Sequence, residues 1–241
     1  MKQIFENLKV EVEKGIIGEN AGISTGFPGL DKYVSVRKKI YTLVFGSSGT
    51  GKSTFVHNAY ILNPFDWWWK NQNNTKIKLK IVYFSQERSA TYVTAKWLCR
   101  KIFLNEGILI PLPKLMGWWD NKLTKDEHDL FLKYKPYFDN MEDVIEIVEG
   151  GQNPTGIYKW MKDWADKNGK TEQITEYNKV YIPNNENLIT LVIVDHQSLI
   201  RKEKGLNTKK EAIDKLSEYL QWGRDFCGFS PVLVAQMNRD I

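Results

Sequence analysis

The order of the segments predicts an α/β fold with a mostly parallel sheet covered by helices on both faces. Three observations indicate it. Apolar, strand-like runs alternate with helix-like stretches; a glycine-rich loop joins the first such strand to the first such helix; and the most apolar strand ends in an aspartate. Alternating strands and helices bring parallel strands side by side. The 241 residues suffice for one large domain with its own core.

Hydrophobic runs and breaker residues locate the elements. Strands are expected at 40–45, 81–84, 144–148, 188–194 and 232–235. Helices are expected at 54–62, 90–105, 124–135, 155–167 and 210–227. The first strand is a run of apolar, β-branched and aromatic residues, so it should be buried, and the first helix should end at Asn63-Pro64. The helix at 124–135 should start at the N-cap Thr124, with Glu127 three residues on, and stop at Pro136.

The N-terminal residues predict a separate helix. Over 2–17, apolar residues recur at spacings of three and four, which is typical of an amphipathic helix. Such a helix should pack either onto its own domain or onto a neighbouring copy. We therefore expect a linker or packing helix within 1–21 and one domain over 22–241.

Two stretches of that domain look like insertions. Residues 63–79 are polar, aromatic and lysine-containing, and we expect an inserted loop or hairpin there. Residues 168–187 are a polar excursion with too little apolar periodicity for any assignment.

The composition is that of a soluble globular protein, with 42% hydrophobic and 26% charged residues. A net charge of +5 permits a nucleic-acid partner without implying one. Cys99 and Cys227 lack metal-type spacing, and we expect both to be reduced. The sequence shows neither a signal-peptide pattern nor an apolar run of membrane-spanning length, so we expect a cytoplasmic protein without a membrane partner.

The glycine-rich loop at 46–53 has the pattern G-x-x-x-x-G-K-S. Between a strand and a helix, this pattern is typical of a phosphate-binding loop. Its backbone N–H groups would face a triphosphate, which glycine permits because it has no Cβ. Lys52 would reach the β- and γ-phosphates, and the Ser53 hydroxyl would ligate Mg²⁺. The predicted cofactors are ATP and Mg²⁺, and the predicted ATP site comprises Gly46, Ser47, Ser48, Gly49, Thr50, Gly51, Lys52, Ser53 and Thr54.

Asp195 follows the apolar strand at 188–194. A carboxylate at the C-terminal end of a parallel strand would lie beside the phosphate loop and hold Mg²⁺ through its water shell. Many strands end in an aspartate at a turn, so the preceding phosphate loop is what favours the metal role.

Two further polar residues follow predicted strands. Glu87 could orient and deprotonate an attacking water, or could be a solvated glutamate in an ion pair with Arg88. Gln236 could donate a hydrogen bond to the γ-phosphate, or could be an ordinary polar residue at a strand end. Spacing alone favours the second interpretation for both residues.

Five sequence stretches that follow one another along the chain favour the functional interpretation of Glu87 and Gln236 instead. They are residues 24–31 (STGFPGLD), the phosphate loop, residues 84–87 (FSQE), residues 194–200 (VDHQSLI) and residues 234–239 (VAQMNR). The series resembles the RecA-type ATPase domain of DnaB-family replicative helicases, including phage primase-helicases. The resemblance runs from about residue 22 to the end of the sequence, and the inserted segments at 63–79 and 105–187 diverge most from the family.

The resemblance implies a hexameric ring that hydrolyses ATP and moves on single-stranded DNA during replication. It implies that Glu87 is the catalytic base, that Asp195 serves Mg²⁺ and that Gln236 senses the γ-phosphate. Primase or other replisome proteins are further expected partners, in a bacterial host cell if the protein is phage-encoded. His196 follows Asp195 as in the phage relatives. We give it no catalytic role, because the side chain after the metal ligand on an extended segment should point away.

The segment 201–210 is strongly basic. Its cations, the predicted DNA-binding residues, are Arg201, Lys202, Lys204, Lys209 and Lys210. In the resembling family this region lines the central channel and contacts the DNA backbone, a contact that would be salt-sensitive and blind to sequence. A solvated loop is the alternative. The tryptophans at 67–69 could likewise stack on bases, although packing onto the domain itself or onto a neighbour is the simpler interpretation.

The sequence departs from the family pattern at one point. The family has an arginine finger beyond the strand that ends at Gln236, whereas this sequence stops at Ile241, with Arg239 as a conceivable substitute. We therefore expect either a fragment of a longer protein, truncated at its C-terminus, or an ATPase that is weak or needs a partner. Two alternatives to a helicase stay open: a RecA- or clock-type ATPase, and a nucleotide-binding structural or loader subunit with little hydrolysis.

Overall fold

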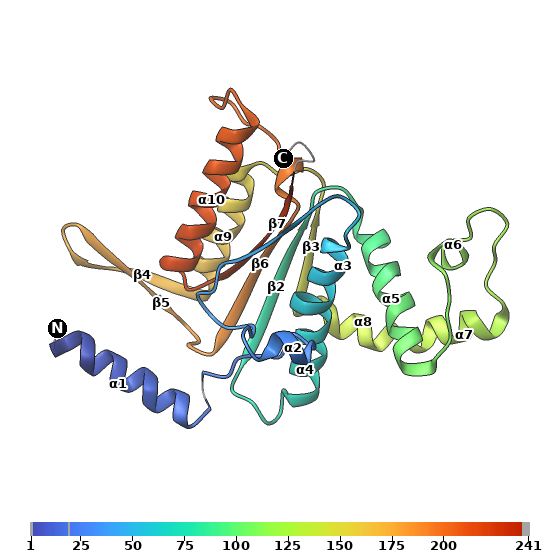
Figure 1. The fold of residues 1–241 in the computed structure, drawn as a ribbon, viewed down its shortest axis with the longest axis horizontal. Helices are drawn as coiled ribbons and strands as arrows, with labels where there is room; N and C mark the ends of the chain where they lie inside the picture. The colour runs from blue at the N-terminus through green and yellow to red at the C-terminus, as the bar shows by residue number, and fades with distance from the viewer. Residues whose placement is uncertain (1, 19, 238–241) are drawn as a thin grey trace.

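A five-stranded sheet forms the centre of the molecule in the computed structural model, which describes residues 2–18 and 20–237 (Figure 1). The strand order is β1-β7-β6-β2-β3, and every pairing is parallel. The strands are β1 (Thr42–Gly46), β2 (Lys78–Ser85), β3 (Ile145–Glu149), β6 (Leu188–Asp195) and β7 (Ser230–Gln236). The predicted fold class is confirmed.

Helices cover both faces of the sheet, as predicted. Side chains on one face of the sheet, such as Ile81, Ile193 and Val234, form one core beneath the elements α3 (Lys52–Val56), η1 (His57–Leu62), α4 (Asn63–Asn71), α5 (Ala90–Glu106) and α8 (Lys135–Glu142). Side chains on the opposite face, such as Val82, Val192 and Leu233, form a second core beneath α9 (Pro154–Asn168) and α10 (Lys209–Asp225). Side chains that alternate along a strand explain the two cores.

The helix after the phosphate loop does not end at Asn63-Pro64, so this prediction is wrong. The chain passes through the π-helix η1 and continues as α4, with Pro64 in its first turn. Phe65 is fully buried, and the three following tryptophans pack against the same core. Residues 63–79, expected to be an inserted loop or hairpin, therefore supply a core helix, because burial of aromatic side chains outweighs the local tendency of Asn-Pro to stop a helix.

Thr124 caps α7 (Lys125–Lys133) in a capping box with Glu127, which confirms the predicted start of that helix. Pro136 does more than stop α7, because it lies in the first turn of α8, where a missing N–H is tolerated. Three short helices lie elsewhere in the chain: α2 (Pro28–Asp31), α6 (Leu112–Leu115) and η2 (Gln197–Leu199).

The strand β1 lies at the border of the sheet, so the prediction of a buried strand at 40–45 is wrong. Within the described ranges it pairs only with β7. Leu43 and Phe45 are 54% and 63% exposed, while Val44 packs against the core. A run of apolar, β-branched and aromatic residues predicts burial on both sides, but a border strand with one covered face buries only alternate residues.

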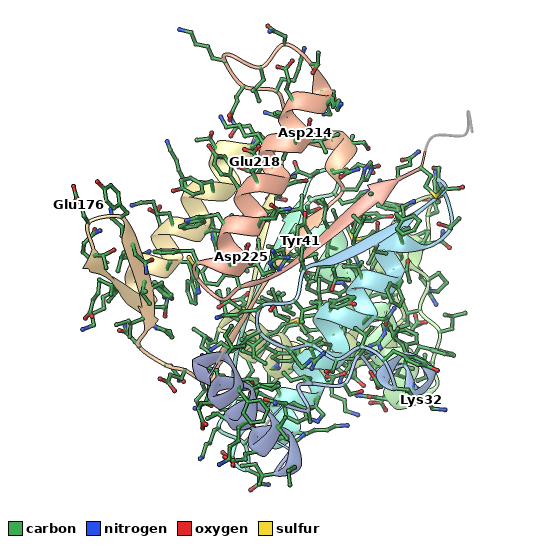
Figure 2. The ribbon with its side chains drawn as sticks, turned by 60° about the vertical axis from the view of Figure 1, so that its left-hand side comes forward. Lys32, Tyr41, Glu176, Asp214, Glu218 and Asp225 are labelled. Carbon is green, nitrogen blue, oxygen red and sulfur yellow. The ribbon has the colours of Figure 1, made fainter. Side chains whose placement is uncertain are left out.

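Two elements extend beyond the sheet and its covering helices. The strands β4 (Gly169–Thr175) and β5 (Asn178–Pro183) form an antiparallel hairpin in the segment left unassigned above, and Figure 2 shows Glu176 at its outer end. The N-terminal helix α1 (Lys2–Ile16) was predicted correctly, yet Phe5, Leu8 and Ile16 are more than half exposed. Among the described residues, packing of this apolar stripe onto its own domain is thus not observed, and packing onto a neighbouring copy stays a prediction. Over the described ranges, no helix combines the length and apolarity that crossing a membrane would need.

Candidate functional site

The predicted site residues gather at the carboxyl edge of the sheet. Gly46 at the end of β1 lies opposite Gln236 on β7, and Ser85 at the end of β2 lies opposite Asp195 on β6. Ligands of open parallel sheets bind outside this edge, where the loops after the strands converge. The sheet register therefore brings the separate motifs together.

The phosphate loop connects β1 to α3. Gly49 and Gly51 have φ angles of 78° and 83°, a left-handed conformation that side chains with a Cβ rarely adopt. Inside the loop, the carbonyl of Ser47 accepts hydrogen bonds from Thr50 Oγ1 at 2.9 Å and Lys52 Nζ at 2.7 Å. Gly51 caps α3 without a side-chain hydrogen bond, so the first N–H groups of the helix stay open to an anion.

A cleft of about 190 Å³ lies beside this loop. Three of the predicted site residues line it together: Ser53 from α3, Glu87 after β2 and Asp195 at the end of β6. The other lining residues are His57, Tyr83, Ser85, Arg88, Tyr92, Val93, Lys96 and His196. The two acidic residues that sequence analysis singled out thus face one cavity with the loop serine.

Asp195 is only 7% exposed. Its Oδ2 accepts a hydrogen bond of 2.8 Å from the Tyr83 hydroxyl, which lies 2.9 Å from His57 Nε2. Burial lowers the pKa of His57 to about 4, and burial together with the neighbouring Asp195 raises the pKa of Tyr83. At neutral pH, His57 is therefore uncharged and Tyr83 keeps its proton.

The oxygen atoms of this cleft fit Mg²⁺. In the described part of the chain, Asp195 Oδ1 is buried and has no hydrogen-bond partner. An ionised oxygen that is buried without a partner is costly unless a cation or an ordered water satisfies it. Mg²⁺ prefers oxygen ligands and typically takes only one or two from the protein, completing its shell with water and phosphate oxygens. Asp195 and Ser53 match that donor set.

Glu87 has a more open environment. Its side chain is 56% exposed, and its Oε1 lies 3.1 Å from Nη2 of Arg88. The guanidinium of Arg88 in turn lies 5.0 Å from the ring centre of Tyr92. Glu87 thus lines the cleft and also pairs with Arg88, and its role as a catalytic base stays a prediction.

Gln236 is exposed at the end of β7, outside the set of residues that line the cleft. It stays close to the phosphate loop, because Met237 N donates to the carbonyl of Gly46 at 3.1 Å. Arg239, considered above as a substitute arginine finger, lies outside the described residues.

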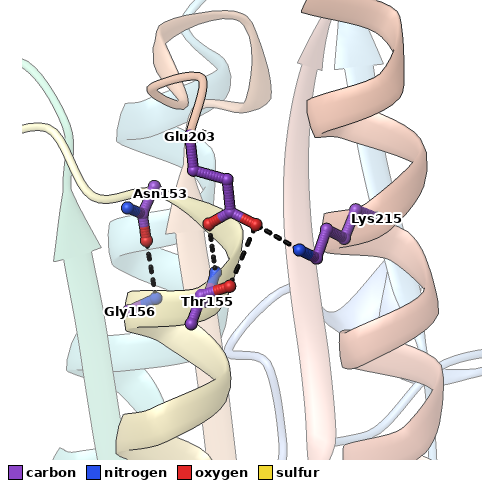
Figure 3. A network of polar contacts seen from close by, with 5 residues as sticks. All are labelled: Asn153, Thr155, Gly156, Glu203 and Lys215. Atoms are coloured by element: carbon purple, nitrogen blue, oxygen red, sulfur yellow. Dashed lines mark hydrogen bonds and ion pairs between the residues drawn. The ribbon is translucent and has the colours of Figure 1, made fainter. Parts of the chain in front are cut away.

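Glu203 anchors the basic segment to two helices (Figure 3). It accepts hydrogen bonds from the backbone N and Oγ1 of Thr155, at 3.2 and 2.9 Å, and forms an ion pair with Lys215. Burial alone would raise the pKa of Glu203, but the hydrogen bonds from Lys215 and Thr155 lower it overall. The acidic residue of the segment therefore pairs with a lysine of α10, and among the described residues it forms no ion pair with the cations of its own segment.

The predicted DNA-binding cations differ in their surroundings. Lys209 donates to the carbonyl of Ile200, and Lys202 donates to that of Asn207 at 3.3 Å. Arg201 is tied through its backbone N to the carbonyl of Gln152 at 2.8 Å, and its side chain is exposed, as is that of Lys204. Lys209 and Lys210 belong to the first turn of α10, which starts one residue before the predicted helix.

His196 is among the residues that line the cleft, and its Nδ1 lies 2.5 Å from Oγ of Ser198. Its expected lack of a catalytic role stays a prediction. The backbone of His196 is still extended, with a φ of −127° and a ψ of 165°. Sequence analysis missed His57 and Tyr83. The only signal for Tyr83 was a polar hydroxyl inside an otherwise apolar strand, and His57 had none.

The fold is that of RecA-like ATPase domains. Among solved structures, the chain is similar to a DnaB-like replicative helicase that was described with its interactions with primase, at a TM-score of 0.68 and 16% identity. It is also similar to a second solved structure, an ATPase domain, at a TM-score of 0.65 and 15% identity. Each match covers 97% of this chain, which spans 48% of the helicase and 71% of the second structure. No protein-family model and no curated protein sequence matches the chain.

Proposed function

We propose that this chain hydrolyses ATP with Mg²⁺ and uses the energy to move along single-stranded DNA, as a DnaB-like helicase. The loop at 46–53 binds the phosphates, with Lys52 on the β- and γ-phosphates. Ser53 and Asp195 hold Mg²⁺, which would neutralise developing charge on the phosphates. Glu87 orients and deprotonates the attacking water, and Gln236 links loss of the γ-phosphate to the basic segment.

The meeting of Ser53, Glu87 and Asp195 in one cleft beside the phosphate loop carries this proposal. A loop alone would support nucleotide binding only. Two carboxylates with different surroundings, one buried and one half-exposed, suit the separate tasks of holding a metal and accepting a proton.

The proposal includes assembly into a hexameric ring. The exposed apolar stripe of α1 supports it, because such a stripe is stable in water mainly when a partner covers it. Primase or another replisome protein is a further proposed partner, since the similar helicase was described with primase.

The decisive experiment measures ATP hydrolysis with and without single-stranded DNA, in parallel with electron micrographs in the presence of ATP. We expect DNA to stimulate hydrolysis several-fold and the chain to form rings. Open filaments would instead support a RecA-type ATPase.

A second candidate is a nucleotide-binding structural or loader subunit, and the ion pair between Glu87 and Arg88 favours it. This candidate requires that nucleotide is bound without turnover and that Glu87→Gln behaves as the wild type. A loss of turnover in Glu87→Gln would exclude it.

A further inference from the structure

A chain of buried polar groups reaches Asp195 from the helical layer. His57 belongs to η1, Tyr83 to β2 and Asp195 to β6, and all three side chains are buried. Tyr83 lies opposite Ile193 in the sheet, on the same face as Asp195 and diagonally across from it. The rings of His57 and Tyr83 meet edge to face, with centres 5.0 Å apart.

The number of protons fixes the direction of the two hydrogen bonds. An ionised carboxylate only accepts, and a tyrosine hydroxyl carries one proton. Tyr83 therefore donates to Asp195 Oδ2 at 2.8 Å and accepts from His57 Nε2–H at 2.9 Å. In a buried setting each bond polarises the next, so His57 strengthens the donor that reaches the carboxylate.

The two oxygens of Asp195 consequently differ. The terminal torsion of an aspartate is broad by itself, so a lone carboxylate could present either oxygen. The Tyr83 hydroxyl occupies Oδ2, whereas Oδ1 is buried and has no hydrogen-bond partner over residues 2–18 and 20–237. Oδ1 is thus the oxygen left without a partner, in a residue that lines the cleft together with Ser53.

We propose that Tyr83, oriented by His57, is the positioning residue for Asp195: it holds Oδ2 so that Oδ1 faces Mg²⁺ or its water shell. This inference rests on the proposed function, because it concerns how the proposed metal site is built. Hydrogen bonds to metal ligands typically contribute about 10- to 100-fold in metal affinity. A merely structural role of the hydroxyl would leave the metal dependence of nucleotide binding unchanged.

The test is binding of a fluorescent, non-hydrolysable ATP analogue to the whole chain, in EDTA and over a Mg²⁺ series. Tyr83→Phe removes only the hydroxyl, and it should raise the Mg²⁺ concentration for half-maximal enhancement of binding by about 10-fold. Affinity in EDTA should stay at the wild-type value, since the phosphate loop is intact. His57→Phe keeps an aromatic ring and should give a smaller shift in the same direction, because Tyr83 can still donate.

Tyr60→Phe is the matched control. Tyr60 lies on η1 in the same core, is equally buried and directs its hydroxyl to Thr42 instead of Asp195. An equal shift in Tyr60→Phe, or unchanged Mg²⁺ dependence in Tyr83→Phe and His57→Phe, would overturn the inference. Should Tyr83→Phe not fold, His57→Phe decides. A wild-type chain whose nucleotide binding is insensitive to Mg²⁺ would remove the proposed function, and the positioning role with it.

Discussion

The two acidic strand ends of the site differ in how firmly the protein holds them. Asp195 is 7% exposed and bound through Tyr83 to His57. Glu87 is 56% exposed and touches only the neighbouring Arg88 among the ion pairs of the described chain. Asp195 is therefore fixed before any ligand arrives, whereas Glu87 can still move.

This difference matches the two proposed tasks. A metal ligand must be held in one geometry, because Mg²⁺ demands near-ideal octahedral coordination. A general base often takes its final position only when the substrate is bound. In the free chain, the proposed metal ligand Asp195 is therefore already in place, whereas the proposed general base Glu87 can still adjust its position.

Replacing each carboxylate by its amide should distinguish the two tasks, and the expected loss of ATP turnover is the largest effect predicted for this protein. Glu87→Gln should lower ATP turnover about 100- to 10,000-fold, the usual contribution of a general base, and keep Mg²⁺-dependent nucleotide binding. Asp195→Asn should lower turnover and also abolish the enhancement by Mg²⁺, since an amide is a poorer ligand for Mg²⁺. Steady-state hydrolysis and nucleotide titration measure both effects, and equal Mg²⁺ dependence in the two variants would contradict the distinction.

Stability should also distinguish the two ends. Tyr83→Phe leaves Asp195 Oδ2 and His57 Nε2 buried without a partner, and should lower the free energy of unfolding by about 1–3 kcal/mol. Arg88→Ala removes an exposed ion pair and should cost less than about 1 kcal/mol. Urea unfolding of both variants provides the comparison. A larger loss in Arg88→Ala would show that the Glu87 side is the more rigid one.

The pH dependence of stability should report on His57. Its pKa falls from 6.5 in the unfolded chain to about 4 in the fold, chiefly through burial. Between these values the unfolded state binds more protons, so the free energy of unfolding should decrease as pH is lowered from 6.5 toward 4, with the full contribution present above 6.5. Urea unfolding at pH 7 and pH 5 measures this change. His57→Phe should show a smaller decrease, and an identical decrease would assign it to other groups.

The smallest effect concerns the basic segment. Lys204 is exposed, whereas Lys209 donates to the carbonyl of Ile200. If Lys204 contacts a phosphate, Lys204→Ala should reduce the slope of log affinity for single-stranded DNA against log salt by about 0.7. Lys209→Ala should change this slope less. Salt titrations of DNA binding decide, and equal slopes in Lys204→Ala and the wild type would exclude Lys204 as a phosphate contact.

The fold and the ends of the strands could be predicted from sequence because both depend on local patterns. Apolar runs located all five core strands, and the phosphate loop fixed where the first one ends. Asp195 was found because a carboxylate directly after an apolar run is visible in the sequence, whereas Glu87 follows its strand at a distance and was singled out chiefly by the resemblance to DnaB-family helicases. Their meeting in one cleft followed from the parallel order of the strands.

The link from His57 through Tyr83 to Asp195 could not be predicted. It depends on the register of β2 against β6 and on the rotation of the π-helix η1 over the sheet, and neither is encoded in spacing along the chain. The helix α4 was missed for the opposite reason. Asn63-Pro64 is a strong local stop signal, and only the burial of Phe65 in the folded protein overrides it.

The border position of β1 has a consequence for handling the protein. One row of its backbone amides and carbonyls has no strand partner within the described ranges, and Leu43 and Phe45 expose apolar side chains beside that row. An exposed edge strand of this kind is a template to which another polypeptide can add a strand. Concentrated preparations of this chain should therefore be prone to precipitation, starting at the very strand that leads into the phosphate loop.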